Sequence, residues 1–144
     1  MPQVGGSGKG WIAMPDELLV LALGAVLLLV HILIAGHYRT RQYGREWNMG
    51  ARDADMPPLN PVAGRLLRAQ ANYLETLPIA IIALLGVVVA DKTSGVTAAA
   101  AWVWLGARVV YLPLYGSGTP KVRTVVWGIA TAAILVVLGV LLFG

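Results

Sequence analysis

The sequence predicts an all-α integral membrane protein, a bundle of four transmembrane helices. Of its 144 residues, 58% are hydrophobic and only 12% are charged, whereas soluble domains carry about 25% charged residues. The hydrophobic residues are concentrated in four long runs, and a helix needs about 20 residues to cross a bilayer. Four such helices leave no room for a separate soluble domain.

Residues 1–15 precede the first run and form the first of two predicted regions. They are rich in glycine and show no helical period, so we expect a flexible tail. A single four-helix domain is predicted over residues 16–144. Asp16 and Glu17 stand where a signal peptide would carry basic residues, and no cleavage-site pattern follows the run. We therefore expect the first helix to be retained in the mature protein.

The four runs differ in length and in whether they contain a charged residue. The first, from Leu18 to Gly36, contains no formal charge, and the fourth, from Thr124 to Phe143, contains none either. The second continues a helical pattern that begins near Ala63, and the third carries Arg108 in its middle. The predicted helices cover residues 17–36, 63–90, 96–115 and 122–143.

The basic residues predict the orientation of the chain. Most of them fall on the side that holds the first and third connections, while Lys9 and Lys92 lie on the other. By the positive-inside rule the basic side faces the cytoplasm and both termini lie outside it. The basic residues on this side are Arg39, Arg41, Arg45, Arg52, Arg65, Arg68, Lys121 and Arg123.

The connections between the runs are unequal in length. The second and third, DKTSG and GSGTP, are short and predict antiparallel neighbouring helices. The first, residues 37–61, contains three prolines and two glycines and shows no clear period. A long connection of this kind is usually functional or disordered. The simplest alternative is a basic loop attracted to anionic lipid head groups.

Polar residues recur at helical spacing inside the predicted spans, where each charge costs about 2.5–3.5 kcal/mol on insertion scales. On the second helix four of them are spaced three, four and three apart, which places them on one stripe, and Pro78 follows where it tends to bend the helix. The third helix repeats the pattern at spacings of four, three and four. These residues are Arg65, Arg68, Asn72 and Glu75, and then Trp104, Arg108, Tyr111 and Tyr115.

Together with Arg123 and Thr124 at the start of the fourth helix, these stripes predict a polar site in the cytoplasmic half of the bundle. One glutamate cannot neutralise four arginines, so the surplus of positive charge indicates an anionic partner, either a ligand or lipid phosphate. The structural alternative is that Glu75 pairs with Arg108 or Arg68 and only fixes the helix register.

Other chemistries find little support in the sequence. The chain has no cysteine, and His31 and His37 are six residues apart, about 240° round a helix, so we assign no metal site. No framed phosphate-binding loop is present, and nothing beyond the basic loop suggests a nucleic-acid partner. If thiol chemistry occurs here, a ligand must supply the sulfur.

Two motifs resemble the MAPEG family, the membrane-associated proteins in eicosanoid and glutathione metabolism. RLLRAQANYLETLP, from Arg65 to Pro78, resembles the family's second-helix signature, and GARVVYLPLYGSGTPKVRT, from Gly106 to Thr124, resembles its third-helix end and the turn that follows. NMGARD, from Asn48 to Asp53, is similar to the bacterial branch. The resemblance covers Leu18 to Phe143.

The resemblance implies a homotrimer with glutathione bound at subunit interfaces that open to the cytoplasm. By this similarity Arg123 lies beside the glutathione sulfur, where a cation lowers a thiol pKa from about 8.5, and Thr124 supplies a hydroxyl. The remaining matched residues would hold the tripeptide or line its site. Arg65 and Tyr111 are added to them because they lie on the same two helix faces. This set is Arg65, Arg68, Asn72, Glu75, Arg108, Tyr111 and Tyr115.

Two functions of different classes follow. The first is a glutathione-dependent transferase or peroxidase of a bacterial inner membrane that acts on lipophilic electrophiles arriving through the bilayer. The second is a non-catalytic membrane module that binds anionic lipid or serves as an accessory subunit of a larger membrane complex. Gln70, Ala71 and Tyr111 depart from the pattern of eicosanoid-type members and favour the second. A small transporter is disfavoured, because the chain shows no internal repeat.

Overall fold

The computed structural model describes residues 13–144, so most of the predicted tail lies outside the described residues. The elements are α1 (Asp16–Tyr43), α2 (Arg45–Met49), α3 (Pro61–Val89), α4 (Gly95–Ser117) and α5 (Pro120–Phe143). Four of them, α1, α3, α4 and α5, are long and apolar enough to cross a membrane. The predicted fold class, an all-α membrane protein with four spanning helices, is confirmed.

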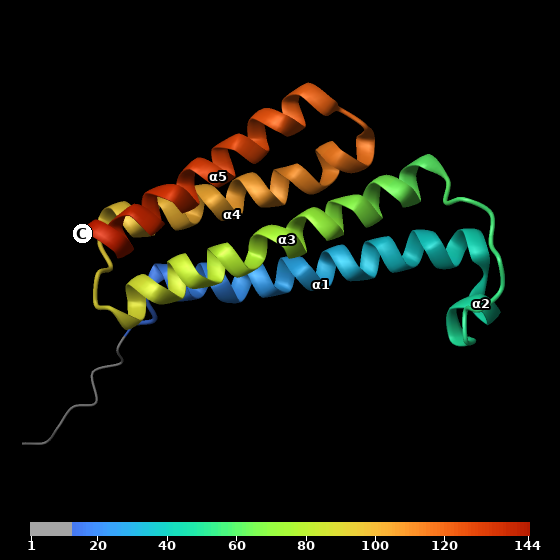
Figure 1. Ribbon diagram of the computed structural model, residues 1–144, viewed down its shortest axis with the longest axis horizontal. Helices are drawn as coiled ribbons and strands as arrows, with labels where there is room; N and C mark the ends of the chain where they lie inside the picture. Colours follow the sequence, from blue (N-terminus) through green and yellow to red (C-terminus); the bar gives the residue numbers. More distant parts are fainter. Residues whose placement is uncertain (1–12) are drawn as a thin grey trace, which may run out of the picture.

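The long helices form two antiparallel pairs, α1 with α3 and α4 with α5 (Figure 1). Contacts of α3 with both α4 and α5 join the pairs into a bundle. On α3 the buried positions include Ala69, Tyr73, Leu77 and Ala80, spaced three or four residues apart on one face. Large apolar residues such as Leu33, which is 70% exposed, point outward. Such an outer surface suits contact with lipid chains rather than water.

Local sequence signals set several helix ends. The side chain of Asn60 accepts a hydrogen bond from the backbone N–H of Ala63 at 2.9 Å, and Pro61 occupies the first turn of α3. Ser94 and Thr97 form a capping box at the start of α4. At the other end of α4 Gly118 adopts the left-handed conformation, with φ of 76°, and the chain reverses into α5.

The first connection is more ordered than its composition indicates. Helix α1 runs to Tyr43, past the end of its apolar run, and stops at Gly44, where φ is 97°. The short helix α2 follows. Gln42 then holds the returning chain, since its amide donates to the carbonyl of Pro58 at 3.0 Å and accepts from the backbone N–H of Asn60 at 2.7 Å. Tyr43 donates to the carbonyl of Pro57 at 2.5 Å.

Two contacts join helices at the end of the bundle where α1 begins and α5 ends, which we call the opposite end. Glu17 is 2% exposed and accepts a hydrogen bond from the hydroxyl of Thr97, joining α1 to α4. Lys92 donates to the backbone carbonyl of Leu141 at 2.9 Å, joining the α3–α4 turn to α5. The other end, which carries the first connection and the α4–α5 turn, is here called the basic end.

Candidate functional site

Arg108 lies at the centre of the polar residues on α4. It is 1% exposed, and its Nη1 donates to Oδ1 of Asn72 on α3 at 3.0 Å. The guanidinium carbon also lies 5.2 Å from the ring centre of Tyr73 and 4.5 Å from that of Tyr111. Aromatic faces attract cations more strongly where water is excluded. One amide and two rings therefore stabilise a guanidinium buried within the bundle.

A second cation and two phenols continue this cluster toward the basic end. The rings of Tyr111 and Tyr115, one helical turn apart on α4, meet edge to face with centres 5.6 Å apart. The guanidinium of Arg123, in the first turn of α5, lies 4.4 Å from the ring centre of Tyr115. The short α4–α5 turn thus brings the cation of one helix onto the aromatic face of the other.

A cavity of about 180 Å³ lies beside this cluster, near the basic end. Asn72 lines it from α3 and Tyr111 from α4, and the rest of the wall comes from Arg123, Thr124 and Trp127 on α5. The hydroxyl of Thr124 donates to the carbonyl of Pro120 in its own helix at 2.9 Å, and the residue is otherwise exposed. We call this space the polar pocket.

The predicted stripe on α3 is divided in the structure. Asn72 lines the polar pocket, whereas Arg68 and Glu75 are exposed on the outer side of the helix. Because a helix turns about 100° per residue, Glu75 lies about 60° round the helix from Asn72, and it is exposed where Asn72 is half-buried. Arg65 is used elsewhere, since its Nε donates to the carbonyl of Gly116 at 2.9 Å and ties α3 to the end of α4.

The pairing of Glu75 with Arg108 that the sequence left open does not occur within this chain. Nη1 of Arg108 bonds to Asn72, and its Nε and Nη2 are buried without a hydrogen-bond partner. Arg108 is thus a buried cation whose hydrogen-bond partner is a neutral amide. Its other two nitrogen atoms, Nε and Nη2, have no hydrogen-bond partner.

A family model for the MAPEG family matches residues 18–143, nearly the whole chain. The chain belongs to the MAPEG family. The resemblance that the two sequence motifs indicated is therefore confirmed, and with it an integral, multi-pass membrane protein of a family associated with glutathione and eicosanoid metabolism. No curated protein matches the chain.

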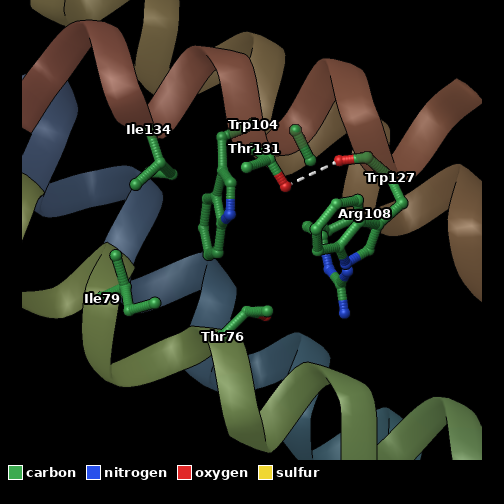
Figure 2. Close-up of a pocket in the computed structure, with 8 residues that line it drawn as sticks. Thr76, Ile79, Trp104, Arg108, Trp127, Thr131 and Ile134 are labelled. Carbon is green, nitrogen blue, oxygen red and sulfur yellow. Dashed lines mark hydrogen bonds between the residues drawn. The ribbon is translucent and has the colours of Figure 1, made fainter.

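This MAPEG protein has a second cavity that the sequence did not predict (Figure 2). It measures about 160 Å³ and lies between α3, α4 and α5. We call it the apolar pocket. Trp127 lines both cavities, and Arg108 lines this one. The sequence contains one indication of this pocket, because Trp104 and Trp127 each lie four residues from a candidate arginine. It does not show, however, which neighbouring helix each indole ring faces. Its lining residues are Thr76, Ile79, Trp104, Arg108, Trp127, Ala130, Thr131 and Ile134.

The histidine of the first span is a core residue of this MAPEG protein. His31 is fully buried and stacks on Tyr73 with ring centres 4.9 Å apart. Within residues 13–144 no group of three or more His, Cys, Asp or Glu side chains is arranged to hold a metal ion.

Proposed function

We propose that this MAPEG protein is a glutathione-dependent transferase or peroxidase that acts on lipophilic electrophiles. The observation that supports the proposal best is the composition of the polar pocket, where Arg123 and Thr124 from α5 meet Asn72 and Tyr111. Glutathione carries carboxylates, amides and a thiol, and the pocket offers a cation, an amide and hydroxyls to match them.

Arg123 and Thr124 are the proposed catalytic residues. The chain contains no cysteine, so glutathione would supply the nucleophilic thiol. Arg123 would hold the sulfur as thiolate, because a neighbouring cation lowers the pKa of a thiol, and Thr124 could turn its hydroxyl toward the same atom. In the transferase reaction the thiolate displaces or adds to an electrophilic carbon. In the peroxidase reaction two glutathione molecules become a disulfide while a hydroperoxide becomes an alcohol and water.

The remaining candidate residues fit a site completed by a second copy of the chain. Arg68 and Glu75 are exposed on a membrane-spanning helix, where a charge facing lipid costs several kcal/mol and normally finds a protein or water-lined environment. We infer a homotrimer in which the outer side of α3 meets a neighbouring subunit. Arg65, Arg68 and Glu75 would then lie beside an interface site formed with Arg108, Tyr111 and Tyr115.

In this arrangement the basic end faces the cytoplasm, both termini lie on the other side, and the chain resides in a bacterial inner membrane. The water-soluble cosubstrate would enter from the cytoplasm, while lipophilic electrophiles would arrive from the bilayer.

Glutathione binding to the purified protein tests the proposal. Titration calorimetry should detect binding at millimolar glutathione or below, and ultraviolet absorbance should reveal bound thiolate. Arg123→Ala should remove the thiolate band and lower turnover about ten- to a hundredfold, the size of one hydrogen bond to a charged group, without preventing assembly. Lys121→Ala is the matched control, since Lys121 is an exposed cation two residues away that does not line the polar pocket. Absence of binding at millimolar glutathione would overturn the proposal.

A non-catalytic function is the second candidate, and one observation favours it. A cavity of about 490 Å³ lies where α1 ends and α3 begins, beside the exposed guanidinium of Arg41. The cation of Arg41 and the position of the cavity at the basic end suit the phosphate of an anionic lipid. Mass spectrometry of lipids that copurify with the protein distinguishes the two functions. Stoichiometric anionic lipid, or recovery within a larger complex, together with no glutathione binding, would favour the membrane module.

A further inference from the structure

The chain turns aside where α1 ends and places α2 beside the last turns of that helix. Gly44, where φ is 97°, changes the chain direction, and α2 then lies next to the end of α1 (Figure 1). The ring centre of Trp47 on α2 is 4.8 Å from that of Tyr43 and 6.0 Å from the guanidinium carbon of Arg39, both on α1. A helix that continued straight would carry residue 47 about 12 Å beyond Arg39. Trp47 instead packs beside residues 39–43.

This level of α1 coincides with the boundary of the membrane. The uncharged run from Leu18 to Gly36 spans about 28 Å as a helix, close to the hydrocarbon thickness of about 30 Å. Arg39 then lies about 5 Å beyond the run and Tyr43 about 10 Å beyond it. The head-group layer on each side of a bilayer is about 5–8 Å thick. Trp47 therefore lies at the level of the lipid head groups.

Contacts within the first connection hold α2 in a fixed shape and leave one apolar side chain uncovered. Nη2 of Arg52 donates to the backbone carbonyl of Asn48 at 3.0 Å and to its Oδ1 at 2.6 Å. The guanidinium carbon of Arg52 also lies 4.9 Å from the ring centre of Trp47. Met49 is 85% exposed. Among the helices of residues 13–144, α2 contacts α1 alone, so no other helix of this chain covers Met49.

Charge does not explain why this segment would lie against the bilayer. Residues 37–61 contain four arginines and three acidic residues, so the attraction of the segment to anionic head groups is largely cancelled. Its apolar and aromatic side chains give a better reason, because an indole ring is favoured at the boundary between lipid and water.

We propose that α2 anchors the first connection to the phospholipids of the leaflet at the basic end. Trp47 lies in the head-group layer, and the exposed side chain of Met49 contacts the adjoining part of the acyl chains. Lipid is a better occupant than a second copy of the chain, because the proposed subunit interface involves α3, whereas α2 packs on α1 beside its outward-facing apolar residues.

Spin labels test where Met49 lies relative to the bilayer. The chain has no cysteine, so Met49→Cys, Leu33→Cys and Asp55→Cys each carry a single nitroxide. Leu33, 70% exposed within the span, is the reference for hydrocarbon, and Asp55, exposed in the same connection, is the reference for water. Power-saturation electron paramagnetic resonance in zwitterionic-lipid nanodiscs compares collisions with oxygen, which concentrates in the bilayer, and with a water-soluble nickel chelate.

We expect the label at position 49 to lie between the two references, shifted from nickel toward oxygen relative to the label at position 55. A label at position 49 that is as accessible to nickel as the one at position 55 would overturn the proposal. A label that neither reagent reaches would indicate a contact with protein, such as a second copy, and would overturn it as well.

The same label separates an apolar anchor from electrostatic attraction. Molar salt shortens the screening length to about 3 Å, yet the oxygen and nickel accessibilities at position 49 should stay unchanged in high salt and should not require anionic lipid. Release of the label into water at high salt would contradict the anchor. Arg123→Ala, which alters the proposed glutathione site, should leave the label at position 49 where it is, because Arg123 lines a different part of the molecule.

Discussion

At the scale of single residues, the bond between Asn72 and Arg108 sets the character of the site. Arg108 retains its charge inside the bundle with one amide oxygen and two aromatic faces as partners. A carboxylate in place of that amide would neutralise the guanidinium and remove the attraction for an anionic ligand. The neutral partner leaves the positive charge uncompensated.

Asn72→Leu should therefore destabilise the protein. It leaves a third guanidinium donor of Arg108 without a partner, and we expect a loss of about 1–3 kcal/mol in the free energy of unfolding. Unfolding in detergent, without glutathione, measures the change. Thr76→Val, one turn along the same helix, is the control, since the Thr76 hydroxyl bonds only to backbone of its own helix. Equal stability of the two variants would mean that the bond to Arg108 contributes little.

Part of this site could be predicted from sequence, and the missing part has a geometric cause. Spacing places Asn72 and Glu75 on the same broad face, which is correct to within about 60°. Spacing does not reveal which neighbouring helix that face meets, and this decides that Asn72 reaches Arg108 while Glu75 stays exposed. The apolar pocket was missed for the same reason, because Trp104 and Trp127 come from different helices.

At the scale of helices, α1 shows what a hydrophobic run does and does not predict. The run from Leu18 to Gly36 locates the part of the helix that contacts lipid. It does not locate the end of the helix, because backbone hydrogen bonding continues in water until a residue such as Gly44 changes the chain direction. The order within residues 37–61 likewise depends on bonds from Gln42 and Tyr43 that no periodic pattern reveals.

Two glycines of α1 should differ in whether they tolerate replacement by a larger residue. A Cβ on Gly24 would lie 3.2 Å from the ring of Trp104 and 3.2 Å from the hydroxyl of Tyr73, whereas one on Gly36 meets nothing within 4 Å. Gly24→Val should therefore cost about 1–3 kcal/mol of unfolding free energy through overpacking. Gly36→Val should be nearly neutral. Thermal unfolding of the two variants in one detergent decides the matter, and similar melting temperatures would argue against a close approach at Gly24.

At the scale of the whole molecule, the outer surface of the described bundle supports the proposed assembly. Its outer surface is apolar almost throughout the spans, yet Arg68 and Glu75 lie exposed on α3. The four spans and the family could be predicted from composition and motifs, because both depend on properties of one chain. The assembly depends on surfaces that meet between chains, so spacing alone predicts it less directly.

Cross-linking tests the proposed assembly directly, because the chain has no cysteine of its own. Ala71→Cys introduces one thiol on the exposed side of α3, between Arg68 and Glu75. In a trimer, copies of one residue approach each other only near the threefold axis. If this side of α3 faces that axis, mild oxidation in membranes should yield covalent dimers. Leu135→Cys on α5, at a position 61% exposed, should yield markedly fewer. Equal cross-linking of the two variants, or none from Ala71→Cys, would contradict the proposed interface.

The contact between Glu17 and Thr97 has a consequence for biosynthesis. The two residues are 80 positions apart in the sequence. During synthesis α1 therefore enters the membrane long before its partner on α4 exists. Until then a carboxylate near the helix start is more stable at the hydrated lipid surface than in hydrocarbon. Helix α1 can pair with α3 early, but its first turn gains its buried place only when α4 arrives. The contact between α1 and α4 thus marks a late step in the maturation of the bundle.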